Sequence, residues 1–430
     1  MDATLHSPPW TCPFCALLCD RFGVVKGETL TPAGTRCPRA THALAEFGAV
    51  PSRATPSVNG QPVDAQTALD TATQWLSGAR QPLFGGMATD VAGARALYRL
   101  ANACGAIVDH AHGRALMHGL TALQDRGAFT TTLAEIRNRA DLVVCVGTSP
   151  SARYPEFFAR CAVGVDAQRV GPARRTVVFL GCDADSALAG RSDVEAFAVP
   201  LQGDLYDTLA TLNTLLGGKS LRGPSDPALA GATSLVERML AANYTAIVWT
   251  PADLPGPHAA LLVERFDRLL KALNRTRRAG GLALGGDDGG ASVNQTLTWL
   301  SGLPLRTGVH RGGLEHAPQR YDTACLIADQ AVDALVWVAS FGSHLPPPRA
   351  PIPTIVLGHP GLATACADRE GPTVFVPVST PGIGSPGHLF RADGGVVLPL
   401  SPVYEDTLPT VAAFAGKLGE ALAPPRENTA

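Results

Sequence analysis

The sequence has no apolar segment long enough to span a membrane. No uninterrupted apolar run in the chain approaches about 18 residues, the length that a bilayer requires. The first ten residues, MDATLHSPPW, also lack the cationic start and apolar stretch of a secretion signal. These absences exclude a membrane partner and predict a protein of the cytoplasm.

Basic runs are missing as well. The 35 Lys and Arg residues nearly balance the 37 Asp and Glu residues, for a formal net charge of −2. No stretch combines clustered basic side chains with aromatic ones, as surfaces that bind a phosphate backbone do. Nucleic acid is therefore excluded as a partner.

The chain also lacks the regular cysteine spacing of a disulfide framework. Of its 10 cysteines, most stand singly in apolar or helical contexts, which is typical of reduced thiols in a protein core. These single cysteines are Cys104, Cys145, Cys161, Cys182, Cys325 and Cys366.

The remaining cysteines form a compact motif near the start of the chain. Cys12, Cys15 and Cys19 have C-x2-C-x3-C spacing, and Cys37 follows with Pro38 directly after it. Thiolates this close on one loop can bind neighbouring corners of one inorganic cube, and a later thiolate completes the set, so the motif predicts a [4Fe-4S] cluster. A four-cysteine zinc site is the rival, although zinc ribbons usually use two CxxC pairs. A metal-free relic of such a site is a third interpretation.

The length of 430 residues exceeds one ordinary core, so several domains are expected. Beyond the cysteine segment, strand and helix signals alternate, which is typical of parallel sheets in an α/β fold. We expect an N-terminal iron–sulfur-type segment over 1–50, a first α/β unit over 51–235, a second over 236–380, and a C-terminal hairpin with a tail over 381–430. Buried strands are predicted at 83–87, 142–146, 176–180, 245–250, 334–339 and 354–357.

Several of the predicted strands are followed by loops rich in Gly, Ser and Asp. The carboxyl ends of parallel strands, with the helix N-termini beside them, offer an anion-binding edge. Each loop alone is ordinary turn chemistry, but together they predict a dinucleotide-shaped crevice. The candidate cofactor-binding residues are Gly147, Pro150, Asp183, Gly203, Asp204, Ser340 and Gly342. A segment with Asn294, Trp299 and Arg311 is expected to be a loop that lines a site.

Motifs in separate stretches of the sequence match one family. They are CPFCALLCD with Cys37-Pro38-Arg39; Asn138-Arg139-Ala140-Asp141 with Gly147 and Pro150; Thr298-Trp299 through Gly302 to Pro304; and Gly382-Ile383 through Gly387 with Phe390-Arg391 and Asp393-Gly394. With these motifs, over nearly its whole length, the chain resembles the B subunit of formylmethanofuran dehydrogenase, of the molybdopterin oxidoreductase superfamily. The resemblance implies two Rossmann-like parallel-sheet units with a small cysteine-rich cluster segment.

The resemblance also implies which cofactors the family binds, and it shows that this chain lacks the cysteine that holds the metal. Archaeal members bind a molybdenum or tungsten bis-pterin guanine dinucleotide, held partly by a cysteine or selenocysteine, and interconvert carbon dioxide and formate. The matching stretch of this chain has Met117 at the position of that cysteine, or Ala115 in a shifted alignment. A thioether or a methyl group cannot replace an anionic thiolate on a hard, high-valent metal, so the pterin dinucleotide is expected to be absent. His118 and Arg311 fall on family active-site positions and are the candidate catalytic residues, although each also suits an ordinary polar role.

The chain is most similar to the bacterial version of this family, the formyltransferase/hydrolase complex of methylotrophs. In that complex formyl groups pass from formyl-tetrahydromethanopterin to a methanofuran-like carrier and are hydrolysed to formate. The implied partners are an amidohydrolase-type A subunit, a β-helix-type C subunit, and a formyltransferase subunit. A structural role within the complex is the first hypothesis. An active molybdenum or tungsten formylmethanofuran dehydrogenase with another metal ligand is the second, and an electron-transfer module using only the iron–sulfur cluster is the third.

Overall fold

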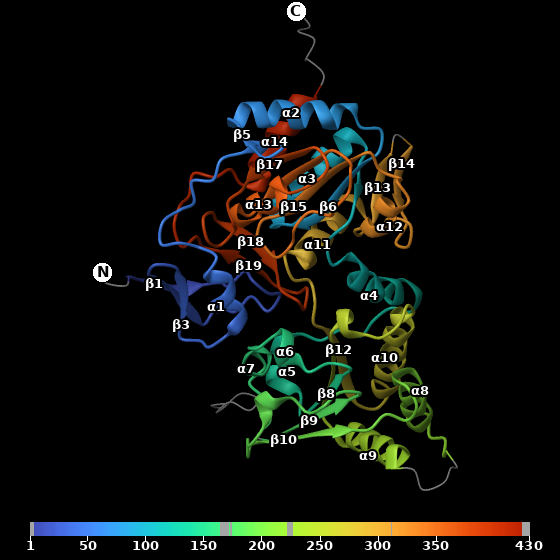
Figure 1. The fold of residues 1–430 in the computed structure, drawn as a ribbon. Coiled ribbons are helices and arrows are strands. Elements are labelled where there is room, and N and C mark those ends of the chain that lie inside the picture. Colours follow the sequence, from blue (N-terminus) through green and yellow to red (C-terminus); the bar gives the residue numbers. More distant parts are fainter. Residues whose placement is uncertain (1–3, 164–171, 173, 222–226, 311, 424–430) are drawn as a thin grey trace, which may run out of the picture. The chain divides into compact units, whose positions relative to one another are not determined.

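The chain forms two compact units (Figure 1). A computed structural model describes residues 4–163, 172, 174–221, 227–310 and 312–423, with only the backbone described for 4–9. Unit 1 combines Met1–Gly113 with Gly286–Ala430, and unit 2 is Arg114–Gly285. Unit 2 is therefore inserted into unit 1 along the sequence.

Unit 1 is built, as far as it is described, on a nine-stranded mixed sheet with the order β14-β13-β7-β6-β15-β16-β17-β4-β5. The central strands β7, β6, β15, β16 and β17 run parallel, whereas the strands at both edges are antiparallel. The strands of this sheet are β4 (Ser57–Val58), β5 (Gln61–Pro62), β6 (Pro82–Ala88), β7 (Ile107–Val108), β13 (Thr307–His310), β14 (Gly313–His316), β15 (Ala334–Ala339), β16 (Thr354–Gly358) and β17 (Thr373–Pro377).

Helices and two small antiparallel sheets complete unit 1. α14 packs against α3 and α2 (Figure 1). α3 begins where the Asp90 side chain accepts the Gly93 N–H and ends at Gly105, whose φ of 72° suits the left-handed cap. The helices are α1 (Pro38–Leu44), α2 (Ala65–Gly78), α3 (Val91–Cys104), α11 (Gly290–Ser301), α12 (Thr323–Ala328), α13 (Ala363–Ala367) and α14 (Val411–Leu422). The small sheets are β1 (Thr4–Trp10), β2 (Phe22–Lys26) and β3 (Leu30–Ala33), and the hairpin of β18 (Gly387–Phe390) and β19 (Val397–Leu400).

Unit 2 contains, within its described residues, a five-stranded sheet of order β10-β9-β8-β11-β12 in which every pairing is parallel. The strands are β8 (Leu142–Val146), β9 (Arg175–Leu180), β10 (Val194–Val199), β11 (Tyr244–Trp249) and β12 (Arg278–Ala283). β8 and β11 are buried over their whole length, as expected of central parallel strands. The helices are α4 (Gly113–Arg126), α5 (Leu133–Arg139), α6 (Pro150–Arg153), α7 (Phe157–Arg160), α8 (Leu205–Leu216), α9 (Pro227–Ala241) and α10 (Ala259–Leu273).

One glycine permits the central pairing of unit 1. β6 and β15 pair in parallel, with an irregularity between Trp337 and Ala339. Gly86 has a φ of 71°, and a Cβ atom there would lie 2.6 Å from the carbonyl oxygen of Val338. A side chain at this position would therefore push the two strands apart, because no Cβ atom tolerates such an approach.

The α/β class with parallel sheets agrees with the sequence analysis, but several details differ. The expected boundaries at 50/51, 235/236 and 380/381 do not coincide with the two units, because β6 and β7 pair with strands that come after unit 2. Asn294 and Trp299 lie on helix α11 rather than on a loop. The C-terminal hairpin is followed by helix α14, which the analysis missed; Gly416 and Gly419 weaken its helix signal.

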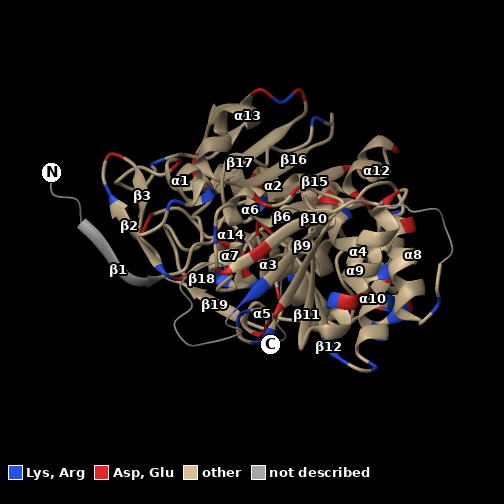
Figure 2. Cartoon of the chain, turned by 90° about the horizontal axis from the view of Figure 1, so that it is seen from below, with Lys and Arg blue, Asp and Glu red and all other residues tan. Residues whose placement is uncertain are grey.

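Charged side chains of both signs are intermixed along the described chain (Figure 2). No stretch of a single sign dominates either unit in this view. Among the described residues, no helix is long and apolar enough to cross a membrane.

A buried cation holds one edge of the unit 1 sheet together. Arg306, just before β13, bonds Asp109 after β7 (Nε to Oδ1, 3.2 Å) and Asp322 before α12 (Nη2 to Oδ2). All three side chains are less than a tenth exposed. Asp109 also accepts the backbone N–H and the hydroxyl of Thr323. Arg306 therefore brings a positive charge to two carboxylates that are buried from water.

Arg306→Met is expected to lower the free energy of unfolding by about 3–5 kcal/mol, because it removes the guanidinium that bonds two buried carboxylates. Urea unfolding followed by circular dichroism measures this change. Arg80→Met is the matched control: its exposed pair with Asp333 contributes less than about 1 kcal/mol. Equal effects of the two substitutions would contradict the role given to Arg306.

Candidate functional site

The cysteines of the N-terminal motif lie together at the small antiparallel sheet of unit 1. Cys12, Cys15 and Cys19 lie on the loop between β1 and β2, and Cys37 directly precedes α1. The loop is closed by a hydrogen bond from the Cys12 N–H to the Cys19 carbonyl (2.9 Å) and by a turn from Leu18 N–H to the Cys15 carbonyl (3.1 Å). All four cysteine residues are buried.

The thiols lie within electrostatic range of one another. Burial raises the pKa of Cys12, and charge on Cys19 or Cys37 would raise it further. Burial also raises the pKa of Cys15, with added contributions from Asp287, Cys12 and Cys19. Without a bound cation Cys12 and Cys15 stay protonated at neutral pH.

The donor set differs from that of a single-ion site. In the described part of the chain, no three His, Cys, Asp or Glu side chains converge closely enough to hold one metal ion. A zinc ion would need its sulfurs within about 4 Å of one another, given Zn–S bonds of about 2.3 Å. The cysteines of a [4Fe-4S] cluster stand further apart, because each one binds its own iron. Among the described residues, the four cysteines are therefore not gathered around a single ion-sized point.

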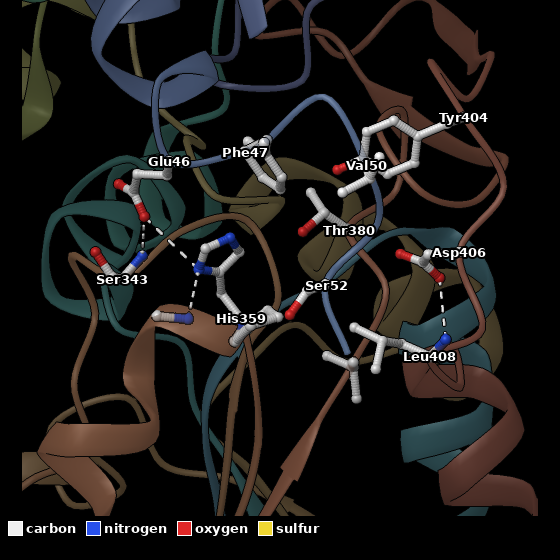
Figure 3. A pocket seen from close by; sticks show the side chains of 14 residues that line it. Glu46, Phe47, Val50, Ser52, Ser343, His359, Thr380, Tyr404, Asp406 and Leu408 are labelled. Atoms are coloured by element: carbon white, nitrogen blue, oxygen red, sulfur yellow. Dashed lines mark hydrogen bonds and ion pairs between the residues drawn. The ribbon is translucent and has the colours of Figure 1, made fainter. Parts of the chain in front are cut away.

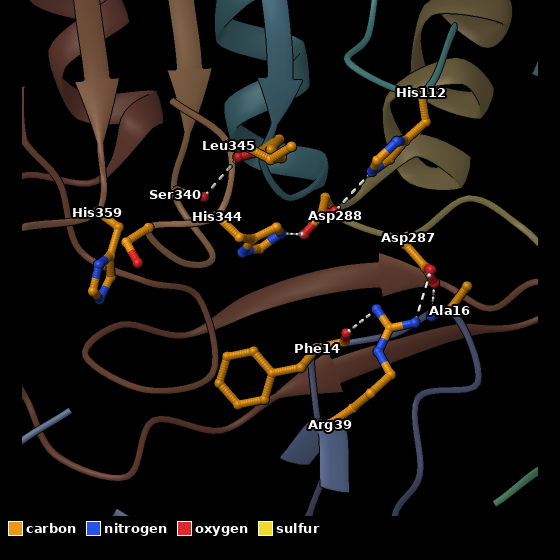
Figure 4. A network of polar contacts seen from close by, with 12 residues as sticks. Phe14, Ala16, Arg39, His112, Asp287, Asp288, Ser340, His344, Leu345 and His359 are labelled. Carbon is orange, nitrogen blue, oxygen red and sulfur yellow. Dashed lines mark hydrogen bonds and ion pairs between the residues drawn. The ribbon is translucent and has the colours of Figure 1, made fainter. Parts of the chain in front are cut away.

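Arg39 and Asp287 bond to each other and to the backbone of the cysteine loop (Figure 4). The Arg39 guanidinium donates to the Phe14 carbonyl (2.9 Å) and to Asp287 Oδ2 (3.1 Å). The other oxygen of Asp287 accepts the backbone N–H of Ala16 (2.8 Å). A further backbone bond, from Ala392 N–H to the Ala16 carbonyl, joins the loop to the β18–β19 hairpin. The loop is thus fixed by polar contacts on both sides.

The next residue, Asp288, binds two histidines from different segments (Figure 4). Its Oδ2 lies 2.9 Å from Nε2 of His112, and its Oδ1 lies 3.0 Å from Nε2 of His344. A third histidine, His110, bonds the Asp288 carbonyl (3.2 Å) and accepts the His112 N–H. Gly289 lets this loop approach the end of β6, because a Cβ there would lie 2.1 Å from the Thr89 carbonyl.

Charge at this network follows from its burial and hydrogen bonds. Burial alone would raise the pKa of Asp288, but hydrogen bonds from His112 and His344 outweigh it and hold that pKa well below its usual range. The bond to Asp288 raises the pKa of His344, assisted by Glu46 and opposed by Arg39. Burial lowers the pKa of His110 to about 4, so this ring stays neutral. Asp288 and His344 therefore form an ion pair below neutral pH.

In unit 2, the predicted cofactor loop after β8 is already bonded to a carboxylate of the chain. Gly147 turns the loop with a φ of 62°, and Pro150 begins α6. The buried Asp185, on the loop after β9, accepts the N–H of Ser151 (2.9 Å), the Ser151 hydroxyl and the N–H of Ala187 (3.0 Å). Burial would raise the pKa of Asp185, but these hydrogen bonds lower it, so an internal anion occupies the donors.

The other cofactor candidates of unit 2 serve local structure. Asp204 caps α8 by accepting the Asp207 N–H (2.8 Å), and Gly203 before it has a φ of 72°. Asp183 is exposed on the loop after β9. The residues after β8, β9 and β10 share one edge of the unit 2 sheet. The carboxylates of Asp185 and Asp204 there bond to backbone N–H groups of a loop and of a helix N-terminus.

The candidates Ser340 and Gly342 lie in unit 1, after β15. Ser340 is fully buried and donates its hydroxyl to the Ala88 carbonyl (2.8 Å), while its own carbonyl accepts the Thr380 hydroxyl (2.7 Å). A Cβ at Gly342 would lie 2.8 Å from Nδ1 of His344. These two residues therefore position the histidine loop and join strand ends of unit 1.

The expected metal position and its neighbours lie on α4. Met117 is 5% exposed, and neither it nor Ala115 carries a thiol. His118 is half-buried on the same helix. Arg311, the other candidate catalytic residue, lies outside the described residues.

The sequence analysis missed the histidine network around Asp288. Its signals were present: His110 and His112 stand two residues apart after a strand, and Asp287 and Asp288 stand between pairs of glycines. Two residues after the candidate Gly342 stands His344. No spacing rule connects these distant segments, and only the strand order of the unit 1 sheet brings them together.

Asp288→Asn is expected to reduce stability more at about pH 5.5 than at about pH 8.5. The raised pKa of His344 means that its bond stabilises fully below the ordinary histidine pKa and is lost as pH rises through the raised value. The lowered pKa of Asp288 means that its contribution is present above the ordinary aspartate pKa and is lost only in strong acid. The contribution of the Asp288–His344 pair to the free energy of unfolding is therefore greatest between about pH 4 and 6.5.

Thermal unfolding of wild type and variant at both pH values measures this difference. At the lower pH we expect Asp288→Asn to lose about 1 kcal/mol of unfolding free energy. The loss is no larger because His344 is half-exposed and solvent screens the pair. Asp329→Asn, at an exposed carboxylate that ends α12, is the control and should show no such dependence. An effect of Asp288→Asn that is equal at both pH values would rule out the ion pair.

Comparisons with known proteins find relatives that cover most of the chain. No family model matches the chain. The B subunit of the formyltransferase/hydrolase complex of Methylorubrum extorquens is 30% identical over 341 residues, which cover 79% of this chain and 89% of the relative. The B subunit of the tungsten-containing formylmethanofuran dehydrogenase 2 of Methanocaldococcus jannaschii is 25% identical over 409 residues, covering 89% and 90%.

A solved structure supports the same family. A chain in the crystal structure of the formyltransferase/hydrolase complex from Methylorubrum extorquens, in complex with methylofuran, superposes with a TM-score of 0.73 at 28% identity. The match covers 86% of this chain and 98% of that chain. The resemblance inferred from the motifs is confirmed: this chain belongs to the family formed by the B subunits of the formyltransferase/hydrolase complex and of formylmethanofuran dehydrogenase.

Proposed function

We propose that the chain is the B subunit of a formyltransferase/hydrolase complex in tetrahydromethanopterin-linked conversion of formaldehyde to formate, and that its role there is structural. The observation that carries the structural role is the residue at the metal position. Met117, or Ala115 in the shifted alignment, stands where the family has a metal-binding cysteine. A neutral thioether is a weak donor to a high-valent oxometal centre, and a methyl group is none.

The closed loop of unit 2 supports this role. A pterin dinucleotide carries a pyrophosphate, which needs free backbone N–H groups or cations at the strand ends. The N–H groups of Ser151 and Ala187 are bonded to Asp185, and Arg153 nearby is paired with Asp253 (2.8 Å). A pyrophosphate would have to displace a buried carboxylate of like charge. These residues do not fit the pterin dinucleotide, and no step of a reaction is assigned to it.

We propose in addition that Cys12, Cys15, Cys19 and Cys37 hold a [4Fe-4S] cluster. Such a cluster, when bound, would supply one-electron chemistry or simply cross-link the segment. The chain's own contribution is positional: the Asp287 carboxylate and the Arg39 guanidinium fix the loop that carries three of the thiols. Because the proposed metal position on α4 has no thiolate, a cluster would have no redox centre to serve within this chain. We therefore propose that the cluster cross-links the N-terminal segment.

The proposed partners are an amidohydrolase-type A subunit, a β-helix-type C subunit, and a formyltransferase subunit. The support is the related chain in the solved formyltransferase/hydrolase complex, 98% of which is covered by the match. Because nearly all of that related chain has a counterpart here, we expect this chain to meet the same kinds of subunit. Catalysis of formyl transfer and hydrolysis would then belong to those partners.

A metal inventory of the assembled complex tests the structural role. We expect the natively purified complex to hold no stoichiometric tungsten or molybdenum, measured by mass spectrometry of the acid-released metals. It should also fail to reduce a viologen dye with formate, while formyl transfer and hydrolysis continue. Stoichiometric tungsten or molybdenum together with formate-dependent dye reduction would establish the active dehydrogenase instead.

Iron and acid-labile sulfide in the anaerobically purified chain test the cluster. We expect about four irons per chain, and loss of most of them in Cys15→Ala and in Cys19→Ala, because each thiolate binds one corner of the cube. Cys325→Ala, at an exposed cysteine outside the motif, should leave the iron content unchanged. Zinc in place of iron, or an iron content that the motif substitutions do not lower, would contradict this assignment.

A further inference from the structure

Unit 1 has a pocket of about 450 Å³ at the carboxyl ends of β15, β16 and β17 (Figure 3). This is the edge of a parallel sheet at which ligands commonly bind, and the volume suits a small organic molecule. Its described lining includes none of the motif cysteines and none of the cofactor candidates. The polar and aromatic residues that line it include Glu46, Phe47, Ser343, His359, Tyr404 and Asp406.

The lining is acidic. Glu46 and Asp406 come from distant parts of the sequence and stand on opposite sides of the pocket (Figure 3). Among the described residues that line it there is no Lys or Arg. The remaining titratable base is His359, and burial lowers its pKa, so the ring adds no positive charge at neutral pH. The pocket therefore presents two carboxylates without a counter-charge of its own.

Each carboxylate keeps acceptor capacity. Glu46 Oε2 accepts the N–H of Ser343 (2.9 Å) and lies 3.6 Å from Nδ1 of His359. Asp406 Oδ1 accepts a long bond from the N–H of Leu408 (3.2 Å). Burial raises the pKa of Asp406, although hydrogen bonding from Ser379 and Leu408 opposes this. A half-buried carboxylate whose hydrogen bonds do not offset its burial is costly unless a ligand supplies further donors.

Aromatic rings complete the lining. Phe47 is buried and packs edge-on against His359, with ring centroids 4.9 Å apart. Tyr404 stands beside Asp406 on the other side of the pocket (Figure 3). A basic group stands behind this ring: Lys26 Nζ lies 6.0 Å from the centroid of the Tyr404 ring, although Lys26 does not line the pocket. Ring faces of this kind pack against methylene groups and attract cations.

These features exclude two common ligand classes. A phosphate or nucleotide would meet two carboxylates and no basic side chain, so its own charge would be repelled. A divalent cation would need at least three ligand side chains close together, and no such group occurs among the described residues. A ligand that donates hydrogen bonds and carries positive charge on an apolar frame fits the two carboxylates and the aromatic rings.

We propose that this pocket binds a small aliphatic diamine, with one ammonium group at Glu46, the other at Asp406, and the carbon chain packed between Phe47 and Tyr404. The proposal is independent of the complex assigned above, because it concerns only groups of unit 1 that the proposed structural role does not use.

Isothermal titration of the full-length chain with putrescine tests the proposal. We expect putrescine to bind more tightly than butylamine, which has one ammonium group, and butanediol, its neutral analogue of the same length, not to bind. Asp406→Asn and Glu46→Gln should each weaken putrescine binding about tenfold, the effect of losing one hydrogen bond to a charged group. Lys26→Gln should strengthen it, because a nearby positive charge is removed.

Glu405→Gln is the matched control, since this carboxylate is exposed, adjacent to Asp406 and outside the lining. It should leave binding unchanged. Thermal unfolding without ligand verifies that each variant is folded; if Asp406→Asn fails to fold, Glu46→Gln decides. The proposal is overturned by absence of putrescine binding, by equal binding of butanediol, by equal weakening in Glu405→Gln, or by pyrophosphate or Mg²⁺ binding that the lining substitutions abolish.

Discussion

Two adjacent carboxylates, Asp287 and Asp288, connect the parts of unit 1 that carry its chemistry. Asp287 bonds Ala16 and Arg39 at the cysteine loop, and Asp288 bonds histidines from the segments after β7 and β15. Neighbouring residues point in different directions, so a single short turn serves both networks at once. The constraint is tight because Asp288 is held in the left-handed region, with a φ of 52°. Any shift of this turn moves the cysteine loop and the histidines together.

The sequence was sufficient for elements whose signal is local. The strands at 142–146 and 334–339 agree with the structure, because continuous apolar runs of this length are a clear signal. The division into units could not be read in this way. It depends on which strands pair, and β6 pairs with β15, which belongs to the far side of the inserted unit. The polar network around Asp288 was not predicted for the same reason, because the order of strands in the sheet brings its members together and their spacing in the sequence does not.

Membership of this family does not by itself carry the family's cofactor chemistry. On α4 this chain has the buried thioether of Met117 and the methyl group of Ala115, and neither is a thiolate. At the end of β8, the chain bonds its loop to Asp185, so that the backbone donors are satisfied internally. Both features favour a stable fold over an open site, because buried N–H groups without partners are costly.

The insertion of unit 2 into unit 1 sets the order in which the two can mature during synthesis. When residue 285 has left the ribosome, every strand of the unit 2 sheet is present, whereas β6 has β7 on one side and still lacks β15 on the other. The apolar edge of β6, with Leu83 and Phe84, stays uncovered until the last third of the nascent chain emerges. While it is unpaired, such an edge is open to chaperone binding or to aggregation.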